Sequence, residues 1–169
     1  MMVREPVQSC ESWIRFCFID NDYSDLVHRI ITMLLAIDQI AFRKQDSIGV
    51  RLEDLKARPK ATLQSLCNWL GIQEKPCLYE MTAQGKKWWG DPTSPDYSTA
   101  KAMSPFDEAS TCRPTGTIFN EQDQFILKTL FYPFRVRFGY QDPDAAKFEA
   151  DLKAIKPLFN GMLGFEETM

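Results

Sequence analysis

Near the start of the chain, an arginine and a serine eight positions apart carry side chains that suit a phosphate group. Arg4 follows the apolar residue Val3, and Pro6 and Ser12 come after it. A guanidinium donates to phosphate oxygens through a planar fork, and a serine hydroxyl adds a donor on a short tether. Proline favours the first helical position. The pattern predicts a strand end, a helix from Pro6, and binding of a phosphate monoester by Arg4 and Ser12.

The same residues also allow a purely structural interpretation. Arg4 can form an ion pair with Glu5 or Glu11, and Ser12 can lie on the solvated face of the helix. An arginine two positions before a proline is a common pattern, so the spacing alone favours this second interpretation. Motifs elsewhere in the chain are needed to decide between the two.

A later segment holds a second arginine and a glycine, Arg113-Pro114-Thr115-Gly116, ahead of a helical pattern at 121–131. Arg113 is a candidate phosphate donor. Gly116 would allow the main chain to approach a ligand closely, because it has no side chain. An ordinary Pro-Gly turn with a solvated arginine is the structural alternative.

Two adjacent tryptophans form the most unusual local string, Lys86-Lys87-Trp88-Trp89-Gly90-Asp91-Pro92. Trp88 and Trp89 in a loop could form an apolar wall for a substrate, and the lysines before them could attract an anion. The alternative is a loop whose aromatic side chains pin it to the core.

The elements that must position these residues follow from apolar spacing. A period of three to four residues predicts helices, and Pro59 and Gly71 mark the start and end of one of them. The predicted helices are 6–18, 25–44, 59–70, 121–131 and 143–159. A short apolar run at 47–52 predicts a buried strand, and residues 73–117, rich in proline and glycine, predict a long loop. Strand, helices and strand in this order predict an α/β fold with a parallel strand pair.

The segment 50–55, Val-Arg-Leu-Glu-Asp-Leu, followed by Pro59 and by Trp69-Leu70-Gly71, resembles sulfotransferases that use 3′-phosphoadenosine 5′-phosphosulfate (PAPS). In that family a strand ends in Arg-Tyr-Glu-Asp-Leu, and a helix that starts at a proline closes in Phe-Leu-Gly. Leu52 here replaces the tyrosine, and Trp69 replaces the phenylalanine. We expect structural roles for this block, with Asp54 capping a short helix and Arg51 pairing with Glu53.

The resemblance implies a nucleotide cofactor and a set of residues that bind it. Arg4 and Ser12 match the segment that holds the 3′-phosphate of PAPS, and Arg113 and Gly116 match a late loop that folds over the same phosphate. The family reaction transfers a sulfuryl group from PAPS to a hydroxyl or amine, and adenosine 3′,5′-bisphosphate (PAP) is the product. The sequence does not name the acceptor. Some bacterial members have a similar Trp-Trp-Gly-Asp string, so Trp88 and Trp89 are the candidate substrate-binding residues.

The resemblance also implies a P-loop-NTPase-like sulfotransferase fold, helix-rich with a small parallel sheet and truncated at its N-terminus. Residues 1–140 would form the C-terminal portion of such a domain, and residues 141–169 an amphipathic helix and tail. The family's Gly-x-Pro-Arg-Ser-Gly-Thr-like loop has no counterpart in the chain, and neither has G-x-x-x-x-G-K-[ST]. No catalytic residue is therefore assigned. We expect an exposed sheet edge that a second copy or a partner chain covers.

Composition excludes several other classes of protein. A net charge of −3 argues against a nucleic-acid-binding protein, and no apolar run approaches the roughly 20 residues of a membrane span. The cysteines are odd in number and lack metal-ligand spacing, and the single histidine, His28, fits a solvated helix face. We expect a cytoplasmic protein without a metal. The alternative to a sulfotransferase-like protein is a non-catalytic remnant that binds a nucleotide or another protein.

Overall fold

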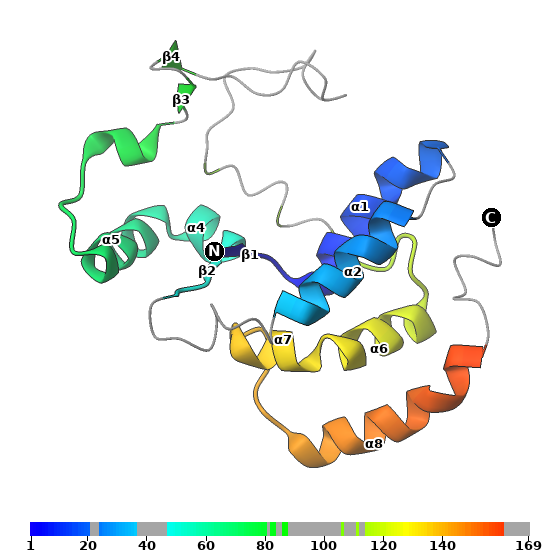
Figure 1. Cartoon of the computed structure of the whole chain (residues 1–169). Helices are drawn as coiled ribbons and strands as arrows, with labels where there is room; N and C mark the ends of the chain where they lie inside the picture. Colours follow the sequence, from blue (N-terminus) through cyan, green and yellow to red (C-terminus); the bar gives the residue numbers. More distant parts are fainter. Residues whose placement is uncertain are drawn as a thin grey trace. The chain divides into compact units, whose positions relative to one another are not determined.

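The computed structural model describes residues 1–20, 24–36, 47–80, 82–83, 86–87, 106, 111 and 114–160. These residues fall into two compact units. Unit 1 comprises Met1, Val3–Gly49 and Arg113–Met169, and unit 2 comprises Met2 and Val50–Cys112. Figure 1 shows the elements in sequence colours. Trp88, Trp89 and Arg113 lie outside the described residues.

Helices make up most of the described residues, and the strands β1 (Met2–Val3) and β2 (Val50–Arg51) form a small parallel sheet. This arrangement is compatible with the α/β class that the sequence predicts. The predicted strand at 47–52 is shorter in the structure, since residues 47–49 are not in a strand and a helix begins at Leu52.

Two helices form the N-terminal part of unit 1. Helix α1 (Pro6–Asp20) begins at the predicted proline, and α2 (Ser24–Ala36) packs against it in the opposite direction (Figure 1). The predicted helix 25–44 is confirmed up to Ala36, and the remainder lies outside the described residues. The inward face of α1 carries Val7, Cys10 and Ile14, all buried.

The C-terminal helices complete the core of unit 1. Helix α6 (Glu121–Leu130) contributes Leu127, and the residues on either side of it, Phe119 and Phe131, are fully buried against the α1 side chains. Helix α7 (Tyr132–Arg137) follows after Phe131, and its Phe134 is also buried.

Helix α8 (Ala145–Ile155) and the 3₁₀ turn η4 (Lys156–Asn160) end the described chain. Their bounds fit the helix predicted at 143–159, with its last turn tightened. The ring of Phe148 stacks on Tyr132, with centroids 4.2 Å apart, and α8 contacts α6. These contacts attach α8 to the same core as α1 and α6.

Unit 2 is built from α4 (Leu52–Ala57) and α5 (Pro59–Leu70), which ends at Gly71 in the left-handed conformation, φ 65°, as predicted. After the 3₁₀ turn η1 (Pro76–Tyr79), the strands β3 (Thr82–Ala83) and β4 (Lys86–Lys87) pair antiparallel. The long loop predicted at 73–117 therefore contains regular structure that proline and glycine content did not reveal.

The predicted cap by Asp54 is wrong, because no side chain caps α4. The Asp54 carboxylate instead lies 2.9 Å from Arg51 Nε and 2.7 Å from Arg58 Nη2. Burial alone would raise the pKa of Asp54, but the hydrogen bond from Arg58 and the charges of both arginines lower it. The two arginines therefore fasten the start of α4 to the start of α5, which is a structural role, as expected for this block.

Candidate functional site

The candidate site lies on the polar face of α1. Gln8, Ser12 and Arg15 are spaced by four and three residues, which brings their side chains to one side of a helix. Glu11 lies between this polar face and the apolar face that carries Val7 and Ile14. Its side chain is buried, with 2% of its surface exposed.

The Glu11 carboxylate holds a segment of the chain more than 100 residues away. It accepts hydrogen bonds from the main-chain N–H groups of Gly116 (2.8 Å), Thr117 (2.6 Å) and Ile118 (2.7 Å), and a fourth from the Thr117 hydroxyl (2.8 Å). Three consecutive amides and a hydroxyl converge on one carboxylate. This cluster, the 116–118 cradle, fastens the segment to α1.

The pKa of Glu11 is lowered by the cradle. Burial alone would raise the pKa of this carboxyl, because a charge is poorly solvated in the interior. The hydrogen bonds from Gly116, the Thr117 hydroxyl, Ile118 and the Thr117 amide favour the charged form and outweigh that effect. Glu11 is therefore ionised at neutral pH, and hydrogen bonds from the cradle donors stabilise its charge.

Arg15 is joined to the cradle through Thr117. An Arg15 Nη2 hydrogen bonds to the Thr117 hydroxyl oxygen, which also contacts the Glu11 carboxylate. A guanidinium has no acceptor and an ionised carboxylate has no donor. The directions are therefore fixed: Arg15 donates to the threonine oxygen, and the threonine O–H donates to Glu11.

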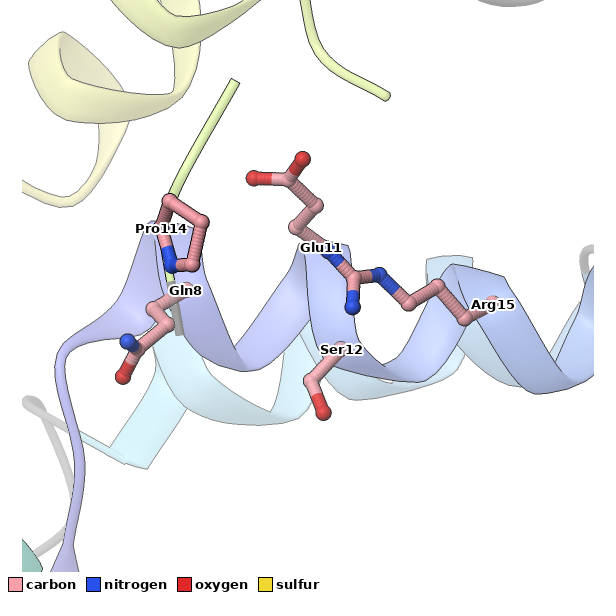
Figure 2. A pocket seen from close by; sticks show the side chains of 5 residues that line it. All are labelled: Gln8, Glu11, Ser12, Arg15 and Pro114. Carbon is pink, nitrogen blue, oxygen red and sulfur yellow. The ribbon is translucent and has the colours of Figure 1, made fainter. Parts of the chain in front are cut away.

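A shallow depression lies over this arrangement, lined by Gln8, Glu11, Ser12, Arg15 and Pro114 (Figure 2). Figure 2 shows the first four side chains extending from α1, with Pro114 supplied by a separate segment. Its cavity volume is about 10 Å³, which is room for roughly one water molecule. A larger anion would bind over the mouth of the depression rather than inside it.

Arg4 is linked to the same face through Gln8, since Arg4 Nε donates to Gln8 Oε1 at 3.2 Å. The neighbouring acid, Glu5, accepts from the main-chain N–H of Gln8 at 2.7 Å and lies 3.3 Å from Arg135 Nε. The Glu5 carboxylate thus already accepts a hydrogen bond from a main-chain N–H group in the first turn of α1. The N-terminus of this helix is therefore a less ready anion site than the strand–helix pattern predicts.

Gly116 is held in a conformation that other residues adopt with strain. Its φ is 93°, and a Cβ built on it would lie 3.0 Å from Gln124 Nε2. Its N–H is directed to Glu11. The glycine therefore serves the approach of the main chain to a carboxylate of the same protein.

The structure brings some of the predicted site residues together. Ser12 lies on the helix to which the segment containing Gly116 is fastened, and Arg4 reaches that helix face through Gln8. Trp88, Trp89 and Arg113 lie outside the described ranges. His28 is exposed on α2, as expected of a solvated histidine.

Sequence reasoning missed Glu11 and Arg15 as members of the site. The signal for Glu11 is its position in the helical repeat, four residues after Val7 and three before Ile14. A charged side chain beside a buried stripe must find hydrogen-bond partners. The signal for Arg15 is its spacing of three from Ser12, which places both on one face.

No group of three or more His, Cys, Asp or Glu side chains in the described ranges is arranged to hold a metal ion. Within the same ranges, no helix is long and apolar enough to cross a membrane. Comparisons with protein-family models, with curated proteins and with solved structures gave no match.

Proposed function

We propose that the chain is a sulfotransferase-like protein that binds the 3′-phosphate of PAPS or PAP over the polar face of α1. Ser12 and Arg15 supply a hydroxyl and a guanidinium at the depression, and Arg4 adds a second guanidinium beside Gln8. Charge-assisted hydrogen bonds of this kind are what a phosphate dianion requires. The finer fold, P-loop-NTPase-like with a sulfotransferase topology, is part of the same proposal.

One observation carries the proposal: the attachment of the 116–118 segment to α1. Two motifs that the sequence offered as parts of one phosphate site are separated by about a hundred residues, and the Glu11 hydrogen bonds bring the second of them to the helix of the first. An arginine directly precedes Pro114, which lines the depression. The proximity supports a shared ligand.

The geometry also limits which donors the phosphate would use. The amides of Gly116, Thr117 and Ile118 are engaged by Glu11, so they are not available to a second anion. The phosphate would therefore be bound by side chains at the mouth of the depression. The family reaction, transfer of a sulfuryl group to a hydroxyl or amine with release of PAP, is proposed for a complete site. No described residue is assigned to that transfer.

Calorimetric titration of the full chain with PAP tests the proposal. PAP should bind more tightly than adenosine 5′-monophosphate, which lacks the 3′-phosphate. Arg4→Ala should weaken PAP binding roughly 10- to 100-fold, the range for a lost hydrogen bond to a charged group. Ser12→Ala should weaken it by a smaller factor. Ser65→Ala, an exposed serine of α5, is the matched control and should leave the affinity unchanged.

Equal affinity for PAP and adenosine 5′-monophosphate would exclude a 3′-phosphate site. Binding of PAP that Arg4→Ala and Ser12→Ala leave unchanged would move the site away from α1. A second assay follows the transfer of radiolabelled sulfur from PAPS to an acceptor. It distinguishes an enzyme from a protein that only binds the nucleotide.

A specific observation favours the alternative function, interaction with another protein. Val27, Ile31 and Leu35 lie at intervals of four on α2 and are 52%, 49% and 58% exposed. Such a stripe gives α2 a second apolar side beyond the one that packs on the core through Ile30 and Leu34. Exposed apolar patches often mark interaction surfaces.

A further inference from the structure

The 116–118 cradle has the composition of an oxyanion receptor. Its four donors converge on two carboxylate oxygens: one oxygen of Glu11 accepts from Gly116, and the other accepts from Thr117 twice and from Ile118. All four distances lie between 2.6 and 2.8 Å, the range of short, charge-assisted hydrogen bonds. Successive main-chain N–H groups of this kind form concave anion-binding sites in proteins.

The ligand that fills this receptor is supplied by the chain itself. Glu11 belongs to a helix whose inward face is locked into the core by Val7 and Ile14, so its carboxylate has little freedom to move away. The receptor, by contrast, is a short segment outside any helix or strand, with Gly116 and Thr117 exposed and the adjoining Phe119 buried in the core. The hydrogen bonds to Glu11 therefore add to the burial of Phe119 in holding Gly116 and Thr117 on α1.

We propose that residues 116–118 form a receptor for a carboxylate, that Glu11 is its built-in ligand, and that a small free carboxylate can replace the Glu11 side chain when it is removed. The chemistry that selects the ligand is a single negative charge shared by two oxygens. Chloride has the charge but not the paired acceptors. Binding of a carboxylate by the cradle does not depend on whether the chain binds a nucleotide.

Amide hydrogen exchange of the full chain, followed residue by residue by nuclear magnetic resonance, tests the inference. In the wild-type protein the amides of Gly116, Thr117 and Ile118 should be protected. Glu11→Ala should lower their protection by at least about tenfold, since each loses a buried partner. Sodium formate should restore much of that protection, and sodium chloride at equal ionic strength should not. Glu149→Ala, at an exposed glutamate of α8, is the matched control and should change nothing.

Unchanged protection in Glu11→Ala would overturn the proposal, and so would equal restoration by formate and chloride. If Glu11→Ala does not fold in chloride, formate should recover its helical circular dichroism, and failure to do so would count against the proposal. Thr117→Val removes only one of the four donors and tests the cradle by a milder change. It should speed exchange at Gly116 and Ile118 several-fold, and exchange at the wild-type rate would also overturn the proposal.

Discussion

At the scale of single residues, the organising feature of unit 1 is a buried acid. Glu11 is 2% exposed, yet its charge is met by four donors. A buried ionised carboxylate without partners would be strongly destabilising. The same arrangement links Arg15 to Glu11 through Thr117, so one glutamate is connected to a cation and to a distant segment.

The lowered pKa of Glu11 predicts a loss of stability in acid. Its pKa in the folded protein lies below the ordinary value of 4.5, so protonation favours the unfolded chain. The stabilisation is fully present above the unfolded pKa, near 4.5, and is lost as the pH falls through the folded pKa. Urea unfolding followed from pH 7 to pH 3 should show this decline in the free energy of unfolding.

Comparison with Glu11→Gln assigns the effect to this residue, because Asp54 also has a lowered pKa. At pH 7 the substitution should cost roughly 1–3 kcal/mol, since an amide has one acceptor oxygen where the carboxylate has two. The difference between the two proteins should shrink as the pH falls below 4.5. A difference that stays constant down to pH 3 would show that Glu11 does not titrate on unfolding. Glu149→Gln should behave as wild type.

At the scale of elements, α6 begins with a reciprocal cap. Asn120 Oδ1 accepts from the Asp123 N–H at 2.8 Å, and Asp123 Oδ2 accepts from the Asn120 N–H at 3.2 Å. Asn120→Ala should lower the free energy of unfolding by about 1 kcal/mol, the usual effect of a lost N-cap. Asn120→Ser should retain most of the stability, because serine also caps. Equal losses in both variants, measured by urea unfolding, would contradict this role.

A close approach joins the segment before β2 to the end of α7. A Cβ on Gly49 would lie 2.4 Å from Phe138 Cε1, which is too short for any stable contact. Gly49→Ala should therefore destabilise the protein by roughly 1–3 kcal/mol, as overpacking does. In the double variant with Phe138→Leu, the combined loss should be smaller than the sum of the single losses. Strict additivity in urea unfolding would show that the ring is not the obstacle.

Element starts and stops were largely predictable from the sequence, and tertiary pairings were not. Pro6, Pro59 and Gly71 act through local backbone geometry, so they mark helix ends without knowledge of the rest of the fold. The pairing of Arg51 with Asp54 was not predicted, because spacing alone does not choose among the near neighbours of an arginine.

The contact between Glu11 and the 116–118 segment is a second tertiary pairing that the sequence did not predict. Local propensity contains no information about which segment a buried carboxylate binds more than 100 residues away. Helical spacing could have marked Glu11 as an acid beside an apolar face. It could not have named Gly116, Thr117 and Ile118 as the donors.

At the scale of the whole molecule, we expect self-association, and the structure suggests which surface would drive it. In the described part of the chain the parallel sheet has two strands of two residues each, and such short edges offer few hydrogen bonds to a second copy. The apolar stripe on α2, by contrast, presents three large side chains that are each about half exposed, those of Val27, Ile31 and Leu35. Light scattering should give a mass above that of the monomer.

Two substitutions distinguish whether the apolar stripe of α2 or the sheet edge drives self-association. Ile31→Lys places a charge in the middle of the stripe and should shift the mass towards that of a monomer, whereas Met2→Lys on the edge strand should have the smaller effect. Ala146→Lys, on an exposed site of α8, is the control. A monomeric wild-type protein over the accessible concentration range would exclude self-association, and a larger effect of Met2→Lys would assign it to the sheet edge.

The sequence separation of 105 residues between Glu11 and Gly116 has a consequence for synthesis on the ribosome. Helix α1 is made first, and its carboxylate has no cradle until residues 116–118 have been added. At roughly 5–20 residues per second, that interval is about 5–20 s. During it, we expect the acid to stay hydrated and the nascent core of unit 1 to remain open. Helices α4 and α5 of unit 2 emerge within this delay, so they have the opportunity to fold first.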